Sequence, residues 1–159
     1  MLTRSLRRRK DSVDAWFDVS SGSDTTSMKD HVEQVKETIL RLETAWNHKN
    51  AYLWASAFTE SCDYIDVFGH FHHEWSHDGN AQLHDRVWKT VYAKSHMQFR
   101  LVKIDFPYDH LCIVVLGCHL EYEFNGQQKV SNTIITAILS KQGPEWRIRN
   151  LQNTSVREV

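Results

Sequence analysis

The sequence predicts one soluble α+β domain in which helices come first and a long antiparallel sheet comes last. Apolar residues recur at steps of three and four up to about residue 58, and the period changes to two near Asp63. From about residue 99 the chain stays extended, broken only by turn signals such as Asn125-Gly126. At 159 residues, with 41% hydrophobic and 25% charged residues, the chain is long enough to bury one core.

The helical part is predicted as two helices before the sheet and one inside it. The first begins near Ser27, which forms a capping box with Asp30. Its apolar stripe consists of Val32, Val35, Ile39, Leu42 and Trp46. Asn50 caps a short second helix that runs to Phe58. A third helix opens at Gly79-Asn80 and carries Leu83, Val87 and Val91 on one face.

The extended part is predicted as six strands. DYIDVFG and HFHHEW form a hairpin around Gly69, before the third helix. After that helix come the strands FRLVKIDF, LCIVVLGCHLEYEF, VSNTIITAIL and EWRIRNLQNTSV, joined by turns at Pro107-Tyr108-Asp109, Asn125-Gly126 and Gln142-Gly143-Pro144. The predicted order is therefore ααββαββββ, an antiparallel meander without a second domain.

The strand LCIVVLGCHLEYEF has one face that is apolar along its whole length. That face consists of Cys112, Val114, Leu116, Cys118, Leu120, Tyr122 and Phe124, and it requires helices packed on it. The opposite face is also apolar at Ile113 and Val115. We therefore expect a second contact on the outer face of the sheet, and we expect it to be a homodimer interface.

Residues 1–26 differ in composition from the rest of the chain. MLTRSLRRRK is basic, and the following DSVDAWFDVSSGSDTTS is acidic and rich in Ser and Thr. The segment has no apolar stretch of the kind found in secretory signals. We expect a flexible N-terminal tail over residues 1–26 and a folded domain over residues 27–157.

Composition excludes several classes of function. A net charge of −1 and an isoelectric point near 6.8 give no basic footprint for nucleic acid, and no apolar run approaches the ~20 residues that span a membrane. The three cysteines form no CxxC pair, so we expect free thiols and a cytoplasmic location. The chain has no glycine-rich phosphate loop and no GxSxG motif, and we expect it to use no cofactor.

Three segments carry a family resemblance: AWN at the end of the first helix, FTESCDYIDVFG, and the terminal WRIRNLQNT. With this element order, residues 28–157 resemble the nuclear transport factor 2-like superfamily, and within it the SnoaL-like proteins of the SgcJ/EcaC type. The resemblance implies a cone-shaped α+β barrel, with a curved sheet and helices enclosing one pocket, and a dimer through the outer face of the sheet. The superfamily contains isomerases, dehydratases, cyclases, epoxide hydrolases and proteins without enzymatic activity.

The steroid isomerases of this superfamily allow a closer comparison. Their catalytic-base segment is similar, without gaps, to TESCDYIDVFG, and the base aspartate falls on Asp66. The tyrosine that stabilises the oxyanion would fall on Leu42, and the protonated aspartate beside it near Ile135 or Thr136. The resemblance therefore implies a base at Asp66 but does not favour steroid isomerase chemistry.

Asp66 is the candidate with the clearest chemical role. Strand alternation places it on the same face as Tyr64 and Phe68. A carboxylate beside aromatic rings in a pocket would have its pKa raised by desolvation, toward the range of a general base. The alternative is a solvated or hydrogen-bonded aspartate with a structural role. We take Asp66, Tyr64 and His70 as candidate catalytic residues.

The histidines around residues 70–84 allow a second interpretation. His70 and His72 would point the same way from a strand, as two metal ligands do, but no third ligand follows from the spacing. We therefore predict no metal site, and we interpret these histidines as residues of the hairpin surface, with an acid or base role open for one of them.

The terminal strand suggests ligand-binding residues. If Trp146 and Ile148 point inward, alternation turns Asn150 and Gln152 into the pocket, and Asn132 on the neighbouring strand could join them. The alternative is that these amides satisfy one another at the mouth of the barrel. Trp46 and Trp88 lie at core spacing on helices and are candidates for the pocket wall.

Two functions follow from these residues. The first is binding of a small molecule, with cofactor-free isomerase, dehydratase or cyclase activity on an apolar oxygenated compound. The second is a non-catalytic homodimeric module that binds a ligand or a partner.

Overall fold

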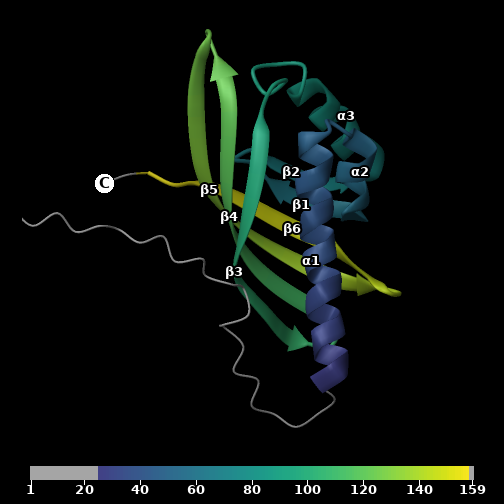
Figure 1. Cartoon of the computed structure of the whole chain (residues 1–159). Helices are drawn as coiled ribbons and strands as arrows, with labels where there is room; N and C mark the ends of the chain where they lie inside the picture. The colour runs from purple at the N-terminus through teal and green to yellow at the C-terminus, as the bar shows by residue number, and fades with distance from the viewer. Residues whose placement is uncertain (1–24, 158–159) are drawn as a thin grey trace, which may run out of the picture.

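The computed structural model describes residues 25–157, and these residues follow the predicted order ααββαββββ (Figure 1). The helices are α1 (Thr25–Asn47), α2 (Ala51–Ser56) and α3 (His77–Val87). The strands are β1 (Phe58–Ile65), β2 (Phe71–Ser76), β3 (His96–Tyr108), β4 (Leu111–Phe124), β5 (Gln127–Gln142) and β6 (Glu145–Ser155). Of the predicted tail, residues 1–24 lie outside the described residues. Thr25 and Thr26 already belong to α1.

The helix starts depend on local side-chain caps. Asn50 caps α2 as predicted, because its Oδ1 accepts a hydrogen bond of 3.0 Å from the backbone N–H of Leu53. The prediction that Ser27 caps α1 is wrong, because the helix has already begun at Thr25. The cap of α3 is Ser76, whose Oγ accepts from the N–H of Gly79, so this helix starts before the predicted Gly79-Asn80.

The six strands form one curved sheet in the order β2-β1-β6-β5-β4-β3. The pairs β1–β2, β3–β4, β4–β5 and β5–β6 are antiparallel, and β1–β6 is parallel. The prediction of a wholly antiparallel sheet is wrong for this pair. The meander leaves one edge of β6 free, and the β1–β2 hairpin pairs with that edge. Because β2 and β3 remain at opposite edges, the sheet is an open cone and not a closed barrel.

Turn residues with positive φ angles fix the meander. Asn125 and Gly126 have φ angles of 52° and 74°, which a two-residue hairpin of the predicted kind requires at both positions. The register of β4 against β5 is continuous from Leu111 to Phe124. No helix among residues 25–157 is both long enough and apolar enough to cross a membrane.

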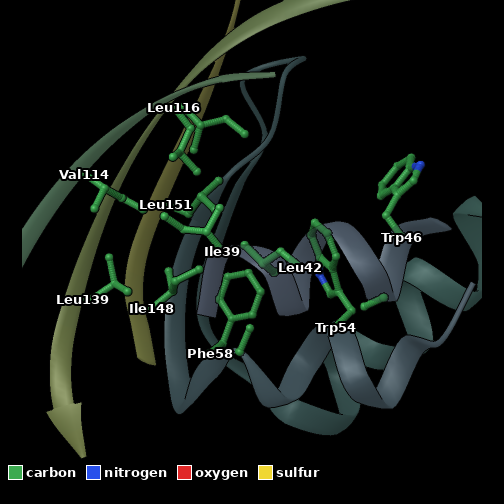
Figure 2. Close-up of a cluster of buried hydrophobic side chains, with 14 of the residues drawn as sticks. Ile39, Leu42, Trp46, Trp54, Phe58, Val114, Leu116, Leu139, Ile148 and Leu151 are labelled. Atoms are coloured by element: carbon green, nitrogen blue, oxygen red, sulfur yellow. The ribbon is translucent and has the colours of Figure 1, made fainter. Parts of the chain in front are cut away.

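Helix α1 runs along the concave side of the sheet (Figure 1). In Figure 2, Ile39 and Leu42 of this helix point toward Val114, Leu116 and Leu139 of the strands. The predicted inner face of β4 is buried at Cys112, Val114, Leu116 and Cys118, and the alternate positions are more exposed. The concave side of the cone, with α1 across it, is therefore where the core lies.

Candidate functional site

A cavity of about 160 Å³ lies inside the core, between α1 and the concave face of the sheet. Its wall consists mainly of aliphatic and aromatic side chains, including most of those labelled in Figure 2. The polar side chains in the wall are Tyr64, Asp66, His84, Tyr92, Ser131, Thr133 and Asn153. Phe68 lines the cavity and is 74% exposed, so the cavity reaches the surface at the β1–β2 turn.

Asp66 lies in the turn just after β1, where its carboxylate organises the β1–β2 connection. Oδ1 accepts hydrogen bonds from the backbone N–H groups of Phe68 (2.9 Å) and His70 (3.0 Å). Oδ2 lies 3.1 Å from Nδ1 of His70 and 3.2 Å from Nε2 of His72. The structure brings Tyr64, Asp66 and Phe68 together on the cavity wall as predicted, but Val67 lines the cavity as well, because β1 ends at Ile65 and strand alternation does not continue into the turn.

The hydrogen bonds to Asp66 shift its pKa in the direction opposite to the one expected. Burial raises the pKa of this carboxyl, but hydrogen bonds from the backbone of His70, the two imidazoles and the backbone of Phe68 outweigh burial, so the pKa lies below its ordinary value. The expectation of a raised pKa is therefore wrong. The sequence contains no Lys or Arg on this strand, and the partners that stabilise the anion are histidines and turn N–H groups.

His84 of α3 is a site residue that the sequence analysis did not select. It is 5% exposed, and its ring lies 4.5 Å from the ring of Trp54 and 6.2 Å from that of Tyr64, measured between centroids. Its Nδ1 lies 2.9 Å from the carbonyl oxygen of Asn80, one helical turn earlier. Burial lowers the pKa of His84 to about 4. Its position one turn before Trp88 could have indicated a core-facing histidine.

Tyr64 stands beside His84 on the same wall. Burial and the charge of Asp66 both raise the pKa of its phenol. Tyr64 and His84 are therefore both uncharged at neutral pH, and both are pocket groups that can exchange a hydrogen bond with a ligand.

A β-bulge in β6 moves the predicted amides out of the pocket. Ile148 pairs with Leu139 and Asn150 pairs with Ile138, so Arg149 is an extra residue on β6. The alternation changes there: Ile148, Leu151 and Asn153 line the cavity. Asn150 and Gln152 instead line a shallow groove with Ile65, Phe71 and Ile138 on the outer face of the sheet. The predicted inward position of Asn150 and Gln152 is therefore wrong, and Asn153 takes their place.

The other predicted residues separate into inner and outer positions. Trp46 lines the cavity, and Trp88 packs edge-on against it at 5.6 Å between ring centroids without being part of the cavity wall. Asn132 lies on the outer surface, where its Oδ1 is 2.8 Å from Nδ1 of His119, so it does not face the pocket. His70 has a side chain that is 72% exposed, and it contacts the site through Asp66.

The remaining candidates for reactive groups are metal-ligating side chains and thiols. Among residues 25–157, no group of three or more His, Cys, Asp or Glu side chains is arranged to hold a metal ion. Cys62, Cys112 and Cys118 are free and buried. Burial raises the pKa of Cys62 and Cys118 to about 11 and that of Cys112 to about 12, so all three thiols are protonated at neutral pH.

Comparison with known proteins gives matches at the level of structure. No protein-family model matches the chain, and no curated protein is significantly similar to it. A domain of unknown function with a cystatin-like fold from Nostoc punctiforme is 18% identical, with a TM-score of 0.71 over 81% of this chain and 79% of that one. A hexachlorocyclohexane dehydrochlorinase (LinA-type3) from Novosphingobium barchaimii is 10% identical, with a TM-score of 0.72 over 83% and 90%.

A third similar structure is named after the superfamily. It is an NTF-2 like protein of unknown function from Shewanella oneidensis, 14% identical, with a TM-score of 0.62 over 77% of this chain and 98% of that one. The narrower resemblance to SnoaL-like proteins of the SgcJ/EcaC type stays a prediction from the sequence. The chain has the fold of the nuclear transport factor 2-like superfamily.

Proposed function

We propose that this domain binds a small, mainly apolar molecule in the cavity between α1 and the sheet. The observation that carries the proposal is an apolar cavity of about 160 Å³ whose wall holds a few convergent polar groups, among them Tyr64, Asp66 and His84. Small-molecule sites combine apolar walls with a few such groups, which orient the ligand. Uncharged Tyr64 and His84 fit a ligand with a polar substituent on an apolar body.

A cavity-filling variant tests this function. Ala137 is 1% exposed and lines the cavity, so Ala137→Leu should fill part of the empty volume and reduce the affinity for apolar probes at least ten-fold. Ala81 is 3% exposed but is not part of the cavity wall, so Ala81→Leu is the matched control. Binding is measured by tryptophan fluorescence, since Trp46 and Trp54 line the cavity. Unchanged affinity in a folded Ala137→Leu variant would contradict the proposal.

A second candidate function is proton transfer on the bound molecule without a cofactor, as in a lyase or an isomerase. The observation that favours it is that Asp66 is the one carboxylate that the described residues contribute to the cavity wall, and that its Oδ2 bonds to two imidazoles. A proton taken from a ligand by Asp66 could pass to His72 or to exposed His70 and then to water. The lowered pKa makes Asp66 a weak base, which restricts this chemistry to ligands with an acidic C–H or O–H bond.

The turnover test uses Asp66→Asn, which keeps an oxygen for the two backbone N–H groups. If Asp66 accepts a proton, this variant loses the reaction by a factor of about 10² or more while apolar probes still bind. The substrate for this test is found by screening with mass spectrometry. If the variant keeps its turnover, Asp66 is not the base, and the binding function alone is supported.

We also propose that the domain forms a homodimer through the outer face of the sheet and works in the cytoplasm. The support is the apolar outer groove of Ile65, Phe71 and Ile138, in which Phe71 is 61% exposed. The described cysteines are free and buried, as a reducing compartment permits. A non-catalytic dimeric module has the same binding cavity and differs only in the absence of turnover.

A further inference from the structure

His84 presents a hydrogen-bond acceptor to the cavity. The carbonyl oxygen of Asn80 can only accept, so the hydrogen of the neutral imidazole must lie on Nδ1. The lone pair is then on Nε2. The ring lies in the cavity wall among Trp54, Tyr64 and Trp75, and among the described residues Nε2 has no hydrogen-bond donor.

Tyr64 adds a second group to the same end of the cavity. Its ring centroid is 6.2 Å from that of His84, and its hydroxyl makes no hydrogen bond with any described residue. A hydroxyl both donates and accepts, so a ligand's hydroxyl could donate to Nε2 of His84 and accept from the Tyr64 phenol. Such a ligand makes hydrogen bonds that a hydrocarbon of the same shape cannot make, which gives it an advantage in this part of the cavity.

The charges around the cavity exclude anionic ligands. Among residues 25–157, the wall contains no Lys and no Arg, and the one carboxylate that these residues contribute, Asp66, is ionised at neutral pH. A carboxylate or phosphate would lose its hydration without gaining a cationic partner. The ligand is therefore not an anion.

The size of the cavity limits the ligand to about one ring. Engineered apolar cavities of about 150 Å³ bind benzene. The cavity here is about 160 Å³ and is lined by similar side chains.

We propose that the cavity selects a neutral, single-ring alcohol or phenol whose hydroxyl donates a hydrogen bond to Nε2 of His84. This inference rests on the proposed binding function and adds the class of the ligand and the residue that selects it. His84 acts here as a binding residue, and the proposal does not depend on catalysis by Asp66.

The test compares phenol, toluene and benzoate, which share a ring and differ in hydrogen bonding and charge. Tryptophan fluorescence and calorimetry measure each dissociation constant for the full chain. We expect phenol to bind about ten-fold more tightly than toluene, and benzoate to bind more weakly than either. In His84→Phe, the preference for phenol over toluene should fall to two-fold or less. His96→Phe, at an exposed histidine outside the cavity, is the matched control and should keep the preference.

A measurement on the unmodified protein covers the case in which His84→Phe does not fold. The ¹⁵N resonance of His84 Nε2 should move when phenol binds and stay in place when toluene binds. Phenol binding without this change, or equal affinities for phenol and toluene, would overturn the selection by His84 but leave the binding cavity in place. If neither phenol nor toluene binds, the proposed binding function itself fails.

Discussion

Nε2 of His72 lies 3.2 Å from Oδ2 of Asp66, which ties the turn after β1 to strand β2. The same carboxylate accepts two backbone N–H groups through its other oxygen, so it closes the hairpin in addition to lining the cavity. A residue that holds the turn cannot be replaced without effects on structure. Tests of chemistry at Asp66 must therefore be separated from tests of stability.

Asp66→Asn should lower the free energy of unfolding by about 1–2 kcal/mol at neutral pH, because the variant loses charge-assisted hydrogen bonds. The pKa of Asp66 is lower in the folded protein than in the unfolded chain, where it is about 3.9. Its stabilising contribution is thus complete above about pH 3.9 and is lost as the pH falls through the folded-state pKa.

Urea unfolding of both proteins at pH 7 and pH 3 measures this effect, and an NMR titration of Asp66 gives its pKa. The difference between the proteins should shrink at the lower pH. A titration midpoint at or above about 3.9 would contradict the stabilisation of the anion.

His84 should make the fold less stable in mild acid. Its pKa is about 4 in the folded protein and about 6.5 when unfolded, so the unfolded chain binds the extra proton between these values. Stability therefore falls as the pH drops below about 6.5, by on the order of 2–3 kcal/mol at pH 4.5. His84→Phe cannot titrate, and its free energy of unfolding should fall less between pH 7 and pH 4.5. Equal pH dependence of the two proteins would mean that His84 is protonated as readily in the fold as in water.

The bulge at Arg149 predicts different effects for two amides on one strand. Asn153 lines the cavity and its Oδ1 is buried without a partner, whereas Asn150 lies on the outer face. Asn153→Ala should change the affinity for phenol several-fold, and Asn150→Ala should leave it within about two-fold. If Asn150→Ala changed the affinity for phenol more than Asn153→Ala, then Asn150 would be the residue that faces the pocket, and the bulge would not explain the difference between the two amides.

The proposed dimer depends on the outer face of the sheet. Light scattering of the unmodified protein should give a mass of twice 18.7 kDa at micromolar concentration. Phe71→Glu should reduce it to the monomer mass, because a charge in an apolar interface is desolvated without a partner. Tyr52→Glu, at a position on α2 that is 77% exposed, is the control and should leave the mass unchanged. A monomer mass for the unmodified protein would refute the dimer.

Regular elements could be predicted from the sequence, and interrupted ones could not. The strand from Leu111 to Phe124 matches its predicted bounds because its pairing with β5 continues without a break, and its predicted inner face is buried from Cys112 to Cys118 but is exposed at Phe124. Alternation fails in β6 because the extra residue at Arg149 resets the face, and Arg149 itself gives no signal of this. The parallel pairing of β1 with β6 depends on packing between segments far apart in the sequence.

The site was predictable in part for the same reason. The predicted strand DYIDVFG leads to Tyr64 and Asp66, both of which line the cavity, although β1 ends at Ile65 and Asp66 lies in the turn after it. The pKa of Asp66 depends on backbone N–H groups and imidazoles that the turn brings to it, and the spacing alone does not indicate them. His84 is one of several histidines near the hairpin, and only the packing of α3 distinguishes it as buried.

The position of β6 has a consequence for how the chain folds during synthesis. This last strand lies in the middle of the sheet, between β1 and β5. Until the C-terminal residues leave the ribosome, β1 can therefore pair only with β2, and the edge of β1 that pairs with β6 in the finished sheet stays open. A nascent chain that ends before Glu145 exposes the inner faces of β1 and β5, and truncation there should give aggregation instead of a smaller folded domain.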